Sequence, residues 1–291
     1  MSPTANLERL RQGMLNVDIT DVRDEPFPHV MKHGILPPDL YAELRADFPK
    51  RDTFAAQGDE SSGVGSRVGK GTGFDIYRGD SAYDRLIGSS SAWAKFDAWI
   101  NSPAFVEKFL ELFGDRLDDL GCKVEVDPSA YDRDLVEGRE VLTDKATTFE
   151  RIGNFGRKIF GSSSKDKNSD VTLFSRLDIE KSIGGYSKPP HCDRANRLCS
   201  LIIYFSDLDG KDVGGDLNVY ALKEERPLDR YDRHPDPKDV ETVASVKPQQ
   251  NLGVFFPCSS NSYHGVNALT DQTIERDFLY INISTETRSA W

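Results

Sequence analysis

The chain has 291 residues, and 37 Lys and Arg against 48 Asp and Glu give a formal charge of 37 − 48 = −11. This acidity argues against a nucleic-acid surface, which needs a net cationic face. The sequence contains no run of 18 apolar residues, so no transmembrane helix is predicted. The four cysteines (Cys122, Cys192, Cys199 and Cys258) form no Cys-x-x-Cys pair, which argues against a structural zinc site and a disulfide framework. The N-terminus offers no signal-peptide core. We therefore expect a cytoplasmic protein without nucleic-acid or membrane partners.

The first third of the chain predicts mostly helices after a short strand at 27–30. Pro37-Pro38-Asp39 is typical of a helix start, and the apolar residues that follow recur every four positions to residue 48. Two further helices are predicted around 93–100 and from Ser102-Pro103 to Gly114. Their aromatic residues form a stripe that we interpret as core rather than as a ligand-binding face. Residues 58–79 are rich in glycine and predict a loop, but they lack the spacing of a phosphate-binding loop.

From residue 171 the pattern changes to short strands separated by turn residues. We expect strands at 171–179, 198–205, 216–222, 245–247, 251–256 and 278–283. Many short strands without helices between them predict an antiparallel sandwich or jelly roll. The fold class is therefore mainly β with N-terminal helices (α+β). We expect a single domain over 1–291, with 1–143 mostly helical, a jelly-roll core at 171–291, and polar stretches at 144–170 and 223–241 that are mobile loops or lids.

A His-x-Asp pair forms the most informative motif. His191 and Asp193 stand two residues apart at the mouth of a strand, and side chains with this spacing in an extended chain point to the same side. An imidazole and a carboxylate on one side can hold a metal ion, and two His with one carboxylate favour non-haem Fe(II). A second such pair, His234-Pro235-Asp236, lies in a charged, proline-broken stretch. We interpret it as a surface decoy because proline removes the backbone bonds that would hold its ligands in place.

The third metal ligand would have to come from another strand. His264 follows the strand at 251–256, although a lone His beside an apolar run is more often structural. Arg276 comes twelve residues after His264 and precedes the last strand. Inside a barrel it would meet a carboxylate ligand, whereas on a strand edge it would pair with Glu275 or Asp277.

The ordered set of motifs resembles the Fe(II)- and 2-oxoglutarate-dependent oxygenase superfamily, in particular its prolyl-hydroxylase-like bacterial branch. The matching segments are 26–29, 36–40, 185–193, 201–205, 214–220 and 263–266. The resemblance implies that His191, Asp193 and His264 bind Fe(II) and that Arg276 binds the distal carboxylate of 2-oxoglutarate. Many relatives in that branch have Lys at the position of Arg276. Ser200 matches a position where relatives often carry Thr near the 2-oxoglutarate.

The resemblance also implies the reaction. We expect a dioxygenase that hydroxylates an unactivated C–H bond of a small-molecule or amino-acid-like substrate, while 2-oxoglutarate and O2 become succinate and CO2. Hydroxylation of peptidyl residues, such as prolyl residues in a protein, is an alternative, so a peptide partner stays open. A non-catalytic jelly-roll binding protein is a further alternative, and it would place His264 and Arg276 away from His191.

Candidate substrate contacts come from residues expected at the mouth of the barrel. The candidates are Tyr77, Arg78, Arg176 and Arg194. For each arginine a surface ion pair is the competing explanation.

Overall fold

The computed structural model describes residues 13–60, 72–136, 167–169, 171–228 and 231–291. Its helices are α2 (Pro38–Ala46), α3 (Arg51–Glu60), α4 (Ser81–Ser89), α5 (Ser91–Ile100) and α6 (Pro103–Phe113). Its strands are β1 (Val22–Arg23), β2 (His29–His33), β3 (Gly73–Tyr77), β4 (Leu173–Ile183), β5 (Lys188–His191), β6 (Arg197–Tyr204), β7 (Leu217–Leu222), β8 (Val240–Val246), β9 (Leu252–Pro257), β10 (His264–Val266) and β11 (Glu275–Thr285).

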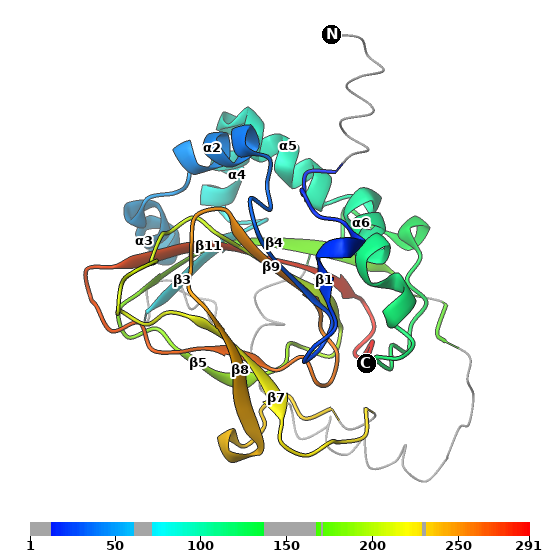
Figure 1. Cartoon of the computed structure of the whole chain (residues 1–291). Helices are drawn as coiled ribbons and strands as arrows, with labels where there is room; N and C mark the ends of the chain where they lie inside the picture. The colour runs from blue at the N-terminus through cyan, green and yellow to red at the C-terminus, as the bar shows by residue number, and fades with distance from the viewer. Residues whose placement is uncertain (1–12, 61–71, 137–166, 170, 229–230) are drawn as a thin grey trace.

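The strands form two antiparallel sheets that face each other. The larger sheet has the order β1-β2-β9-β6-β11-β4-β3, and the smaller has the order β5-β10-β7-β8. From β4 to β11 the chain passes back and forth between the two sheets, which is the topology of a jelly roll. Figure 1 shows the smaller sheet below the larger one. The predicted fold class is confirmed.

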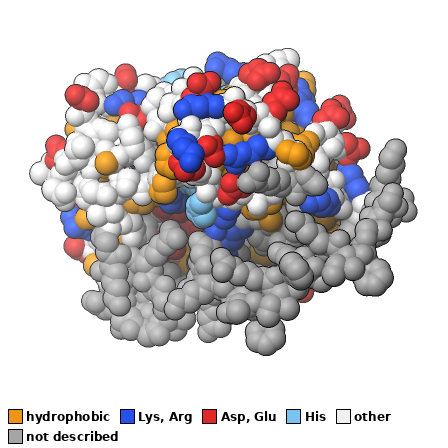
Figure 2. Space-filling view, turned by 90° about the horizontal axis from the view of Figure 1, so that it is seen from below, with side chains coloured by type: hydrophobic (Ala, Val, Ile, Leu, Met, Phe, Trp, Pro, Cys, Tyr) orange, Lys and Arg blue, Asp and Glu red, His pale blue; other side chains and the backbone are white. Residues whose placement is uncertain are grey.

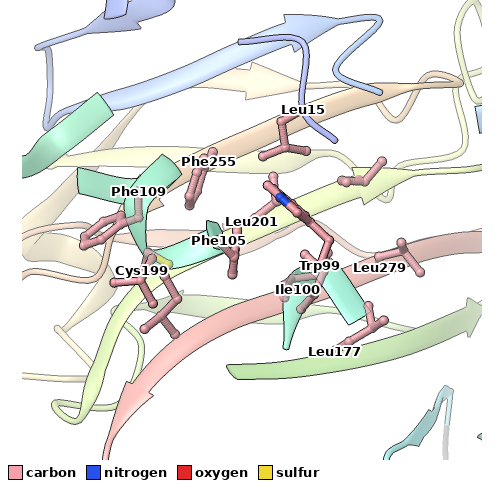
Figure 3. Packing of buried hydrophobic residues seen from close by; sticks show 14 of the residues in the cluster. Leu15, Trp99, Ile100, Phe105, Phe109, Leu177, Cys199, Leu201, Phe255 and Leu279 are labelled. Carbon is pink, nitrogen blue, oxygen red and sulfur yellow. The ribbon is translucent and has the colours of Figure 1, made fainter. Parts of the chain in front are cut away.

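The helices cover the outer face of the larger sheet (Figure 1). Aromatic residues of α5 and α6 pack on that face, and Figure 3 shows Phe105 and Phe109 beside Phe255 of β9. The ring centroid of Phe255 lies 5.9 Å from that of Phe105 and 6.3 Å from that of Phe109. The interpretation of the aromatic stripe as core is confirmed, because this burial removes large apolar rings from water.

A second apolar cluster fills the space between the sheets. It joins inward-facing residues of the larger sheet, such as Ile202 and Tyr204, to Leu217 and Val219 of the smaller one. Side chains alternate along each strand, so β6 and β11 supply both clusters at once. Consequently, the polar side chains on their inner faces are exceptional and mark the region of the site.

Some local predictions differ from the structure. The segment 58–79, expected to be a loop, contains the end of α3 and the edge strand β3, while residues 61–71 lie outside the described part. Strand β3 has a glycine at its start because the ring of Tyr186 lies against it, 3.0 Å from where a Cβ of Gly73 would be. Strands β1, β2 and β3 of the N-terminal part all join the larger sheet. The strand expected at 245–247 spans Val240–Val246, which overlaps the expected loop at 223–241, and the predicted loop at 144–170 falls mostly outside the described residues.

Candidate metal centre

Three buried side chains meet at one end of the smaller sheet. His191 is the last residue of β5, Asp193 follows it by two positions, and His264 is the first residue of β10. Strand β10 pairs with β5 so that His264 lies directly opposite His191. One possible ligand atom from each residue lies within 4.8 Å of the others. The structure thus brings together the three residues that the sequence analysis selected.

Backbone carbonyls orient both imidazole rings. Nδ1 of His191 lies 2.9 Å from the carbonyl oxygen of Pro189, and Nδ1 of His264 lies 3.1 Å from that of Ser262. When Nδ1 carries the proton and donates it to the carbonyl, Nε2 is left as the basic nitrogen. The Nε2 atom of His264 lies 3.8 Å from Oδ2 of Asp193. Each ring therefore presents one lone pair to the space beside the carboxylate.

A hydrogen-bonded network from β6 and β11 holds the Asp193 carboxylate. The Ser200 hydroxyl donates to Asp193 Oδ2 at 2.6 Å and lies 3.0 Å from the Tyr280 hydroxyl. Arg197 Nη1 donates to the Tyr280 hydroxyl at 2.5 Å and lies 3.6 Å from Asp193 Oδ1. The carboxylate, which comes from the loop after β5, is thereby fixed against the larger sheet.

The electrostatics favour the protonation states that a metal needs. Burial, with a contribution from His264, lowers the pKa of His191 to about 3, and burial also lowers the pKa of His264. Burial alone would raise the pKa of Asp193, but His264, Arg197 and the Ser200 hydrogen bond together hold it well below its usual value. Two neutral imidazoles and one carboxylate anion are therefore ready as ligands at neutral pH. This donor set fits Fe(II) with open positions for further ligands.

Arg276 occupies the inner face of the barrel at the start of β11. Its side chain is 1% exposed, and its guanidinium lies 4.2 Å over the ring of Phe278 and 5.0 Å over that of Tyr204. Nη2 donates to the Tyr204 hydroxyl at 3.2 Å, whereas Nε and Nη1 have no hydrogen-bond partner among the described residues. The alternative of an exposed strand-edge arginine is wrong, because Arg276 is buried. Lys181, and not Arg276, pairs with the two neighbouring carboxylates, with Nζ at 2.7 Å from Glu275 and 2.5 Å from Asp277.

The buried guanidinium fits an acidic ligand. Leaving charged donors unpaired in an apolar site costs free energy that a bound carboxylate would recover. Nη1 and the Tyr204 hydroxyl, which flank Nη2, can donate to one carboxylate, an arrangement that suits a dicarboxylic ligand.

The candidate substrate residues are divided between the barrel interior and its surroundings. Arg176 is buried on the inner face of β4, with its guanidinium 3.8 Å over the ring of Tyr77 and Nε bonded to Asp178 at 2.6 Å. The side chain of Arg78 donates to the carbonyl oxygen of Arg133. Arg194 directly follows Asp193 and is partly buried. Tyr77 and Arg176 thus share the inner face with the metal centre, whereas Arg78 binds a neighbouring backbone segment.

The second His-x-Asp pair, His234-Pro235-Asp236, was interpreted as a surface decoy, but it lies close to the candidate metal centre. His234 is exposed as expected, yet its ring centroid is 6.2 Å from that of His191. Its segment is bonded to the ligand strand, because Cys192 N donates to Arg233 O at 3.0 Å and Tyr263 Oη to Asp232 O at 2.9 Å. Figure 2, which shows the molecule from below, has histidine surface on this face among charged side chains.

Several residues around the site were missed by the sequence analysis. They are Arg197, Tyr204 and Tyr280, which contact Asp193, Arg276 or Ser200, and Asn282, a buried amide on the inner face of β11. Their signal in the sequence was alternation: a polar or aromatic residue at every second position of a strand marks one face. Only the pairing of β6 with β11 shows which face carries the chemistry.

One family model matches the part of the chain that carries these residues. Residues 179–283 match the model of the 2OG-Fe(II) oxygenase superfamily. No curated protein sequence matches the chain significantly. None of the described helices has the length and apolarity needed to cross a membrane.

Several solved structures resemble the chain. A prolyl 4-hydroxylase from Phytophthora capsici is 13% identical, with a TM-score of 0.45 over 98% of this chain and 68% of that one. A prolyl-4-hydroxylase from Pseudomonas putida is 14% identical, with a TM-score of 0.44 over 88% and 91% of the two chains. The alpha-ketoglutarate-dependent epimerase SnoN from nogalamycin biosynthesis is 11% identical, with a TM-score of 0.41 over 97% and 84%.

Proposed function

We propose that this chain, a member of the 2OG-Fe(II) oxygenase superfamily, is a 2-oxoglutarate-dependent dioxygenase that hydroxylates an unactivated C–H bond of a small-molecule or amino-acid-like substrate. The single observation that carries the proposal is the meeting of His191, Asp193 and His264 in one buried cluster beside the barrel interior. Fe(II), 2-oxoglutarate and O2 supply the oxidising chemistry, in which RH, O2 and 2-oxoglutarate become ROH, succinate and CO2.

The roles of the residues follow from their positions. His191 and His264 would bind the metal through Nε2, since Nδ1 of each ring faces a carbonyl. Asp193 would provide the anionic ligand, and Ser200 would position that ligand through its 2.6 Å hydrogen bond. Arg276, assisted by Tyr204, would bind the distal carboxylate of 2-oxoglutarate.

The surroundings support a reaction that is kept from bulk water. The three candidate ligands are at most 8% exposed, and apolar side chains fill the space between the sheets. Exclusion of water protects a reactive centre from side reactions. Since β1, β2 and β3 complete the same sheet as the core strands, we propose that 1–291 is a single oxygenase domain. The 223–241 segment is a candidate lid, because its residues Asp232 and Arg233 accept hydrogen bonds from Tyr263 and Cys192, which adjoin His264 and His191.

Anaerobic titration with Fe(II) and then 2-oxoglutarate tests the proposal. Chelation of the iron by the keto acid should give a visible charge-transfer band. The band should be absent in His191→Ala, and in Arg276→Ala it should require at least about tenfold more 2-oxoglutarate, since a charge-assisted contact is lost. Arg116→Ala is the matched control, because Arg116 pairs with Asp24 at the surface. A folded, iron-loaded wild type without the band would refute the oxygenase function.

A further inference from the structure

One buried amide beside the metal centre has an unused hydrogen-bond donor. Asn282 lies on the inner face of β11 and is 0% exposed. Its Oδ1 accepts a hydrogen bond from the Ser284 hydroxyl at 2.9 Å, whereas Nδ2 has no partner among the described residues. An unpaired buried donor costs about 1–3 kcal/mol, so proteins seldom keep one without a reason.

The strand register places Asn282 at the level of the metal. Asn282 is directly opposite Ser200 of β6, which donates to Asp193, and directly opposite Arg176 of β4. Arg276 lies six residues away on the same strand, a separation of about 20 Å between Cα atoms at the usual rise per residue. The unused donor is therefore far from the residue that would hold the distal carboxylate of 2-oxoglutarate, and it lies at the level of the candidate metal ligands.

The charges on this face determine what that molecule can be. The guanidinium of Arg176 is already paired with Asp178 at 2.6 Å and lies 3.9 Å from Asp75. Glu180 stands opposite Asp75 on the same face. Lys188 reaches across from β5 to 5.8 Å from the ring of Tyr280. Arg197, on the neighbouring strand β6, is likewise close to a carboxylate, with Nη1 at 3.6 Å from Asp193 Oδ1. Each guanidinium beside Asn282 therefore already faces a carboxylate, which disfavours a further anionic group here.

We propose that Asn282 is a substrate-binding residue whose amide nitrogen donates to a neutral carbonyl oxygen, and that the substrate is an amide that is neutral or positively charged near this point. The inference rests on the proposed oxygenase function. It narrows the substrate class from amino-acid-like molecules in general to those whose carboxyl group is masked as an amide. Asn282 would place the carbonyl, and hence the neighbouring C–H bonds, beside the metal.

Direct binding tests the proposal without turnover. The full-length protein is loaded with Zn(II) in place of iron and with 2-oxoglutarate. The probes are N-acetyl amino-acid amides of the twenty side chains, each paired with its free N-acetyl acid. Saturation-transfer NMR should detect at least one amide that binds at least about tenfold more tightly than its acid. Asn282→Leu and the isosteric Asn282→Asp should each weaken that amide about tenfold or more, which is the loss of one buried hydrogen bond.

The controls separate this proposal from the one on which it rests. Asn218→Asp is the matched control, since Asn218 bonds Tyr220 and Ser245 on the smaller sheet, and it should bind the amide as the wild type does. The Fe(II)–2-oxoglutarate band should persist in both Asn282 variants, which also shows that they fold. A wild type without the band would overturn the oxygenase function and this inference together. With the band present, weaker 2-oxoglutarate binding in the Asn282 variants, tighter binding of acids than amides, or no binding of any amide would overturn this inference alone.

Discussion

Replacing Glu180 with glutamine should change the pH dependence of stability. Glu180 lies on the inner face of β4, between the side chains of Asp178 and Ser182 along the strand. It pairs with Asp75 of β3. Burial raises the pKa of its carboxyl group from 4.5 to about 7, with Lys188 partly opposing the shift and Asp178 and Asp75 adding to it. The folded protein therefore keeps a proton on Glu180 at a pH where the unfolded chain has lost it.

The magnitude follows from the shift of the pKa. The difference, 7 − 4.5 = 2.5 units, corresponds to about 3.4 kcal/mol at 1.36 kcal/mol per unit. Because Glu180 retains part of its contact with solvent, we expect about 2 kcal/mol. The folded state binds one more proton at Glu180 between pH 4.5 and 7, so the contribution of Glu180 to stability is fully present below pH 4.5 and is lost as the pH rises to 7. Glu180→Gln carries no such proton and should gain this amount relative to the wild type between pH 4.5 and 8.

Urea unfolding of both proteins at pH 5 and pH 8 measures the effect. The free energy of unfolding of Glu180→Gln, relative to the wild type, should rise by about 1.3 kcal/mol from pH 5 to pH 8, because part of the effect is already lost at pH 5. Glu241→Gln, at an exposed position of β8, is the matched control and should show no comparable rise. A rise for Glu180→Gln of less than about 0.5 kcal/mol would refute the reasoning, because it would mean that the carboxylate is solvated in the folded protein.

Four further substitutions test the site, two glycine positions and the core. Ser200→Ala removes the 2.6 Å hydrogen bond to Asp193 and should weaken Fe(II) binding about 10- to 100-fold in a metal titration, and unchanged affinity would exclude a positioning role. Gly214→Ala would place a Cβ 1.9 Å from the carbonyl oxygen of Ala268 at a φ of +71°, so it should cost about 3 kcal/mol or more. Gly210→Ala, at a φ of +68° with open space around it, should cost only about 1 kcal/mol, and equal costs for the two would contradict the steric argument. Phe255→Ala should lower the free energy of unfolding by about 3–5 kcal/mol, and a cost below about 1 kcal/mol would show that the helices do not depend on this contact.

The metal site could be selected from the sequence because its chemistry needs few residue types in a fixed order. His191 and Asp193 were selected by their spacing together with the apolar strand that follows them, which the structure shows as β6. The partners of the site could not be found in this way. Tyr280 and Asn282 acquire their roles through the pairing of β11 with β6, which joins positions about eighty residues apart.

Local signals misled the analysis where tertiary packing decides the structure. Proline was taken as an argument against the His234-Pro235-Asp236 pair, yet strand β5, which ends in the candidate ligand His191, itself contains Pro189 and Pro190. That strand survives because only two of its register positions, His191 and Lys188, pair with β10, and neither is a proline. Similarly, β3 was hidden in a glycine-rich stretch because it is an edge strand whose inner residues are polar.

The two prolines of β5 also bear on how the protein behaves at high concentration. Strand β5 forms one border of the smaller sheet, and such borders expose backbone groups that can recruit a strand from another molecule. Pro189 and Pro190 have no N–H to offer, so an incoming strand would find fewer backbone donors along this border. The strand that ends in His191 is thereby protected from intermolecular β-sheet growth. A chain in which both prolines were replaced by valine would therefore be expected to self-associate through this border. The strand that carries His191 would then lie in the contact between molecules.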